Sequence, residues 1–125
     1  MIKYHHYHPE NIKHYFNLTL LRYQKKANGD VSDLYELDLA AGEKREGGFA
    51  FTNDEKLMLY NSGETKLRFW FTPDKTAPMP SNYFDLEADD VIEFLVSKYA
   101  NDGDRFLMIQ NLSDTVEGSV EIEKV

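Results

Sequence analysis

The sequence predicts an all-β fold, an antiparallel β-sandwich of the immunoglobulin-like or jelly-roll-like type with about seven or eight strands. Apolar and polar residues alternate with a period close to two, which is typical of half-buried strands. Clusters of Asn, Asp and Gly separate these segments about every ten residues, as in small sandwiches and barrels. Apolar residues make up 42% of the chain and aromatic residues 14%, so the strands have enough material for a core.

Three segments show the alternation most clearly. Residues 65–71 direct three large apolar side chains to one face, namely Leu67, Phe69 and Phe71. The opposite face of that segment carries Arg68 and Trp70. Residues 91–99 and 119–125 alternate in the same way, so all three segments are predicted to be strands with one buried face.

Other segments give weaker strand signals. Residues 15–24, 33–40, 57–60 and 105–111 are predicted strands, and residues 49–51 form a possible short eighth strand. Residues 106–109 are apolar without a break, which favours a central strand covered on both faces. One helical turn is expected over residues 9–14, where Pro9 suits a first helical position.

Turn signals predict how the strands connect. Residues 28–30, 61–63 and 101–104 each contain Asn and Gly, which tolerate positive φ, and we expect them to close β-hairpins. Residues 40–48 are expected to form a mobile exposed loop, and residues 72–85 a long connection restrained by three prolines. The last two predicted strands resemble the closing hairpin of immunoglobulin-like sandwiches.

A chain of 125 residues suits one domain, which we place at residues 14–125 after a polar, His-rich N-terminal segment, residues 1–13. The net charge of −8 and the absence of a polybasic cluster argue against nucleic acids and anionic membranes as partners. Because the chain has no Cys, disulfides and thiolate sites are excluded. With no export signal and no long apolar stretch, we expect a soluble protein, cytoplasmic by default.

The His cluster near the N-terminus is the candidate site for a transition metal. Neutral imidazole is a common ligand for divalent transition metals, and the candidate ligands are His5, His6, His8 and His14. In an extended segment His6 and His8 would project to the same side, and Glu10 could add an oxygen ligand. The alternative, which we favour, is a polar and partly disordered segment that happens to be rich in His. No cofactor is otherwise expected.

Exposed aromatic and cationic side chains are the candidate binding residues. The only tryptophan, Trp70, shares a strand face with Arg68, and such pairs are enriched at protein interfaces. Tyr60 is a second aromatic candidate. Met79 lies between two prolines in the connection 72–85, and a conformationally restricted loop loses less entropy on binding. If the Trp70 face is covered, this ring is simply part of the packing.

Catalytic patterns are weak, because the chain has no nucleophile elbow, phosphate-binding loop or zinc-protease helix. The sequons at Asn17 and Asn111 fall in or beside predicted strands and are attributed to chance. The leading hypothesis is therefore a non-catalytic module that binds a protein partner or another copy of itself. Two alternatives stay open: a carbohydrate-binding, lectin-like domain that stacks sugars on aromatic rings, and a metal-dependent enzyme or metal-binding protein based on the His cluster.

Overall fold

The computed structural model describes residues 34–125, which form a sandwich of two β-sheets with almost no helix. The elements are β1 (Leu34–Leu39), β2 (Lys44–Glu46), β3 (Lys56–Tyr60), β4 (Leu67–Thr72), β5 (Phe84–Leu86), β6 (Val91–Leu95), the 3₁₀ helix η2 (Val96–Lys98), β7 (Phe106–Asn111) and β8 (Gly118–Lys124). The all-β prediction is confirmed, and so is the expectation of seven or eight strands.

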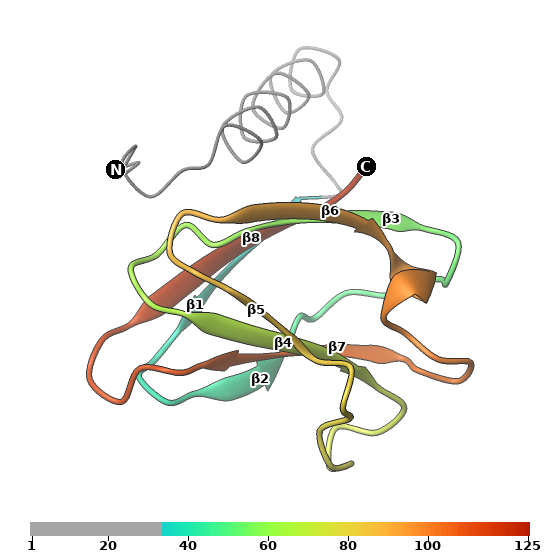
Figure 1. The fold of residues 1–125 in the computed structure, drawn as a ribbon, viewed down its shortest axis with the longest axis horizontal. Coiled ribbons are helices and arrows are strands. Elements are labelled where there is room, and N and C mark those ends of the chain that lie inside the picture. Colours follow the sequence, from blue (N-terminus) through green and yellow to red (C-terminus); the bar gives the residue numbers. More distant parts are fainter. Residues whose placement is uncertain (1–33) are drawn as a thin grey trace.

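The eight strands are shared equally between the two sheets. One sheet has the order β1-β8-β3-β6, the other has the order β2-β7-β4-β5, and every pairing is antiparallel. The sheets lie one above the other and enclose the core (Figure 1). Eight strands wound in this alternating order form a jelly roll, so the jelly-roll-like type is the one that the chain adopts.

Most connections cross from one sheet to the other, and this corrects the hairpin prediction. Residues 61–63 join β3 to β4 and residues 101–104 lead into β7, and both connections change sheet. The last two strands are not a hairpin either, because β7 pairs with β2 and β4 whereas β8 pairs with β1 and β3. Turn residues allow the chain to reverse its direction. Which strand the next strand pairs with depends on where the apolar face of that next strand can be buried.

Two short strands lie where loops were expected. Strand β2 occupies the middle of the predicted mobile loop 40–48, and β5 follows the proline-containing connection. Residues 49–51 do not form a strand, and residues 96–98 form η2 instead of extending β6. Strands of three residues carry almost no periodic signal, so their pairing depends on the neighbouring strand.

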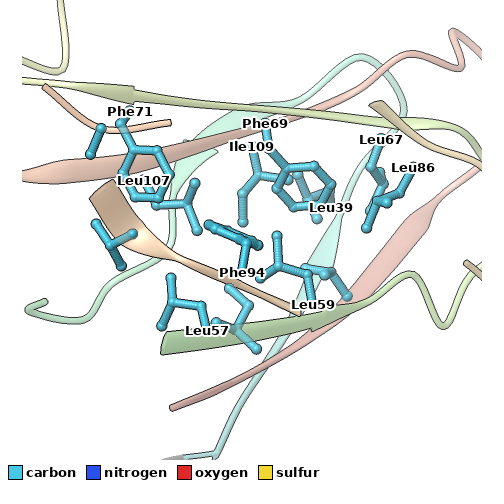
Figure 2. Packing of buried hydrophobic residues seen from close by; sticks show 14 residues of the cluster. Leu39, Leu57, Leu59, Leu67, Phe69, Phe71, Leu86, Phe94, Leu107 and Ile109 are labelled. Atoms are coloured by element: carbon cyan, nitrogen blue, oxygen red, sulfur yellow. The ribbon is translucent and has the colours of Figure 1, made fainter. Parts of the chain in front are cut away.

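The core is formed by side chains that point inward from both sheets (Figure 2). Its fully buried members include Leu57 and Leu59 of β3, Phe69 of β4 and Ile109 of β7. Aromatic rings connect the two sheets, since Phe84 of β5 lies 5.4 Å from Phe94 of β6 between ring centroids. Strand β7 is central, as its unbroken apolar run predicted. Packing of this kind supplies the main stabilisation of a domain without disulfides.

Several predictions fall outside the described residues. These are the N-terminal segment 1–13, the helical turn 9–14, the strand 15–24 and the turn 28–30. The domain boundary at residue 14 therefore stays a prediction. Over residues 34–125, no helix is both long and apolar enough to span a bilayer.

Candidate functional site

The predicted binding residues lie on two different surfaces. Arg68 and Trp70 point outward from β4, in the sheet β2-β7-β4-β5, and Met79 lies in the connection between β4 and β5. Tyr60 ends β3 in the other sheet and points away from the core, so the structure does not bring it near Arg68. The structure therefore does not bring the four predicted residues onto one surface.

Both aromatic candidates are buried, which corrects the expectation that they are exposed. Trp70 is 3% exposed and Tyr60 is 5% exposed. Trp70 lies opposite Met108 of β7, and the Lys44 ammonium is 6.0 Å from the centre of its ring. Neighbours on the same sheet face thus cover Trp70, and its ring is not available as a platform for a sugar or a partner.

The candidate metal ligands His5, His6, His8 and His14 all lie outside the described residues. Within residues 34–125, no group of three or more His, Cys, Asp or Glu side chains is placed to hold a metal ion. The metal site at the N-terminus therefore stays a prediction.

The connection between β4 and β5 carries two exposed apolar side chains. Met79 is 41% exposed and Tyr83 is 40% exposed. The guanidinium carbon of Arg68 lies 4.3 Å from the centre of the Tyr83 ring, a cation–π contact that orients the ring. Sequence reasoning named Arg68 and Met79 but not Tyr83, because only the β4–β5 register places Tyr83 beside Arg68.

Arg68 is itself held by a carboxylate from the neighbouring strand. Its Nε and Nη2 donate hydrogen bonds to the two oxygens of Asp85, at 2.8 and 3.0 Å. These hydrogen bonds lower the pKa of Asp85 below its ordinary value and raise the pKa of Arg68 above its own. Lys66 adds a cation between Asp85 and Glu87, at 3.9 and 3.2 Å. These two hydrogen bonds to one carboxylate fix the orientation of the guanidinium plane on which the Tyr83 ring lies.

The first half of the connection is also ordered by side chains. The Asp74 carboxylate accepts hydrogen bonds from the backbone N–H and the hydroxyl of Thr76, both at 3.0 Å, which lower the pKa of Asp74. The hydroxyl of Thr72 donates to the carbonyl of Asp74 at 2.7 Å. Lys75 reaches back to Glu46 of β2 at 2.8 Å and lies 5.2 Å from the Phe106 ring. These bonds tie the connection to its own sheet.

We call the set Arg68, Met79, Tyr83 and Asp85 the β4–β5 site. It combines a preformed backbone, two exposed apolar side chains and an arginine whose orientation is fixed. Chemically the site offers van der Waals contact and a cation–π face. Its one carboxylate is already bound by the guanidinium of Arg68. This arrangement suits recognition of a surface.

A separate pocket of about 390 Å³ opens on the other sheet, where residues 36–38 of β1 pair with residues 119–121 of β8. Its lining is rich in acids and contains none of the predicted binding residues: Glu36, Leu37, Asp38, Ser62, Ser119, Val120 and Glu121. The hydroxyls of Ser62 and Ser119 lie 3.0 Å apart and hydrogen-bond to each other. The acidic lining favours a cationic occupant.

No protein-family model and no curated protein matches the sequence. Among solved structures, the chain is similar to a de novo designed double-stranded β-helix, with a TM-score of 0.50 and 14% identity over 75% of this chain and 100% of that one. It is also similar to PirA, with a TM-score of 0.53 and 10% identity over 77% of this chain and 96% of that one. A mutant of a functionally unknown conserved protein from Bacillus anthracis strain Ames gives a TM-score of 0.54 and 10% identity, over 74% of this chain and 22% of the other. At these identities the likeness concerns the fold alone, and that fold is the double-stranded β-helix, or jelly roll.

Proposed function

We propose that the protein is a non-catalytic module that binds a protein partner, or a second copy of itself, through the β4–β5 site. The observation that carries the proposal is the pair of exposed apolar side chains, Met79 and Tyr83, on a connection that side-chain hydrogen bonds hold near both ends, at residues 72–76 and at Asn82. Tyr, Met and Arg are enriched in the centres of protein interfaces. A preformed loop also loses little conformational entropy when it binds.

The packing between the two sheets supports a binding site on the outer surface of the protein. In jelly rolls and barrels a ligand can occupy the space between the sheets. Here that space is filled by aliphatic and aromatic side chains such as Leu59, Phe69 and Ile109, which have no exposed surface (Figure 2). These side chains provide neither acid–base groups nor metal ligands, so we place the function on the outer surface.

The proposal is tested with the double variant Met79→Ala, Tyr83→Ala in the full chain. Val116→Ala is the matched control, because Val116 is 44% exposed in the β7–β8 connection, away from this site. Sedimentation velocity over a concentration series measures self-association, and affinity capture followed by titration with the recovered protein measures binding to a partner. We expect the double variant to weaken the interaction by about tenfold or more, and the control to leave it unchanged.

Two results would contradict the proposal. One is an interaction of equal strength in the wild-type chain and the double variant. The other is that the protein stays a monomer at all concentrations and that no captured partner depends on Tyr83 for its binding. Thermal unfolding of each variant, followed by the fluorescence of buried Trp70, shows that the fold is retained.

A further inference from the structure

The outer face of the sheet β1-β8-β3-β6 has apolar side chains that are buried although the sheet lies on the surface of the sandwich. Met58, Tyr60 and Val91 are 3%, 5% and 5% exposed and form a cluster separate from the main core. The second sheet lies on the opposite side of the strands that carry them (Figure 1). A side chain on an outer face is buried only when something covers it.

The same face is strongly acidic. Register places Glu123 between Leu34 and Met58 across three strands, and Glu121 between Glu36 and Tyr60. Two carboxylates therefore lie directly opposite each other, Glu36 on β1 and Glu121 on β8, which is an unfavourable cross-strand pair in isolation. Glu123 is only 1% exposed, and a buried carboxylate requires donors or a cation nearby. A cover that carries positive charge as well as apolar surface is complementary to this face.

Residues 1–33 match both requirements. They contain five Lys and Arg against three acids, a net charge of +2, whereas the whole chain carries −8, so residues 34–125 carry −10. All four His residues also lie among the first 33 residues. The apolar side chains of that stretch include Phe16, Leu18 and Leu20. The chain is thus divided into a basic N-terminal part and an acidic sandwich.

The point of attachment favours this segment over any other occupant. Residues 1–33 join the sandwich at Leu34, which itself lies on the outer face, opposite Glu123. A sheet of four strands is about 15 Å across at about 4.8 Å between neighbours. A chain of 33 residues can extend much further than that, at about 3.3 Å per residue. Its tether also keeps the local concentration of the segment high.

We propose that residues 1–33 pack over the outer face of β1-β8-β3-β6, with apolar side chains on Met58, Tyr60 and Val91 and with basic side chains beside Glu93, Glu121 and Glu123. The N-terminal part of the chain is then the intramolecular cover of this face. The inference uses the sheet opposite the β4–β5 site, so it stands or falls independently of the proposed function.

Zero-length carbodiimide cross-linking of the full chain tests the proposal directly. Equal amounts of ¹⁴N- and ¹⁵N-labelled protein are mixed, so that mass spectrometry separates links within one chain from links between two. Two ion pairs of the sandwich serve as positive controls, Lys56–Glu93 at 3.2 Å and Lys75–Glu46 at 2.8 Å. We expect intramolecular links from Lys13, Lys25 or Lys26 to Glu93, Glu121 or Glu123.

A second measurement uses the absence of Cys from the chain. The thiol introduced by Met58→Cys should react slowly with a maleimide, whereas the thiol introduced by Leu95→Cys, at a position 49% exposed, should react fast. The triple reversal Arg22→Glu, Lys25→Glu, Lys26→Glu should speed labelling at position 58 by about tenfold or more. Lys98→Glu, an exposed position on η2, is the matched control and should have no effect.

Three results would overturn the proposal. Links that join two chains only would assign the face to a second copy. Positive-control links without any link from residues 1–33 to this face would show that the segment lies elsewhere. Labelling at position 58 that the triple reversal does not change would exclude the basic side chains as its anchor. Trp70, in the other sheet, reports by fluorescence that each variant is folded.

Discussion

Asn61 and Asn111 occupy corresponding corners of the two halves of the sandwich. Asn61 follows the third strand of the first half and Asn111 ends the third strand of the second half. In both corners the side-chain oxygen accepts a hydrogen bond from the N–H two residues ahead, Gly63 at 3.2 Å and Ser113 at 3.0 Å. Both amides are buried, at 0% and 1% exposure.

The amide nitrogens of these two residues tie the corners to other strands. Asn61 donates to the carbonyls of Thr65 and Leu86, at 2.7 and 3.1 Å. Asn111 donates to the carbonyls of Val116 and Ala40, at 2.8 and 3.2 Å. The sequences Asn-Ser-Gly-Glu-Thr at 61–65 and Asn-Leu-Ser-Asp-Thr at 111–115 repeat this corner. The burial of Asn111 also agrees with the sequon there being a chance match.

Replacing Asn111 with Ala should lower the free energy of unfolding by about 1–3 kcal/mol, because the part-buried carbonyls of Val116 and Ala40 lose their donor. Asn61→Ala should cost a similar amount. Urea denaturation followed by Trp70 fluorescence measures both. Asn101→Ala, at an exposed position, is the control and should change stability by less than about 0.5 kcal/mol. Equal stability of Asn101→Ala and Asn111→Ala would show that the corner amide contributes nothing.

Gly63→Ala should destabilise the fold by about 1–3 kcal/mol, because an added Cβ would lie 2.7 Å from the backbone nitrogen of Ser119. Gly42 offers a contrast, since it has open space around it but a φ of +72°. Asn tolerates that conformation better than Ala does, so Gly42→Asn should be more stable than Gly42→Ala. At Gly63 the Asn variant should be no better than the Ala variant. Thermal unfolding of the four variants distinguishes a steric cause from a conformational one.

Leu59→Ala should lower the free energy of unfolding by about 2–5 kcal/mol, because Leu59 is fully buried and its loss leaves a cavity between the sheets. Chemical denaturation measures the change. Val116→Ala removes a comparable apolar group from an exposed position and should cost less than about 0.5 kcal/mol. A Leu59→Ala chain as stable as the wild type would mean that the interior of the sandwich is not its core.

The Arg68–Asp85 pair should stabilise the fold in a pH-dependent way. Hydrogen bonds from Arg68 lower the pKa of Asp85 in the folded state, so their contribution is fully present above the pKa of an unfolded Asp, about 3.9. The contribution is lost as the pH falls through the lower, folded pKa. A double-mutant cycle of Asp85→Asn and Arg68→Met, measured by thermal unfolding between pH 7 and pH 2, should show coupling that is constant near neutrality and disappears in acid. Coupling that persists unchanged at pH 2 would contradict the assignment.

The sequence by itself determined the fold class and the inward-facing residues. Alternation in residues 65–71 and 119–125 requires one buried face per strand, and this holds for Leu67, Phe69, Val120 and Ile122. The uninterrupted run in β7 likewise identified a central strand. These features are local, because a period of two can be read from the order of the side chains alone.

Only the tertiary structure decided which strands pair and which surface residues meet. A turn such as Asn61–Gly63 reverses the chain equally well within a sheet or between sheets, and the choice depends on which apolar faces can close over each other. The contact of Tyr83 with Arg68, and the burial of Trp70 and Tyr60, depend on strand neighbours that are distant in the sequence. Alternation along a strand does not predict whether an outward-facing side chain is exposed. That exposure depends on which side chains of neighbouring strands and loops cover it.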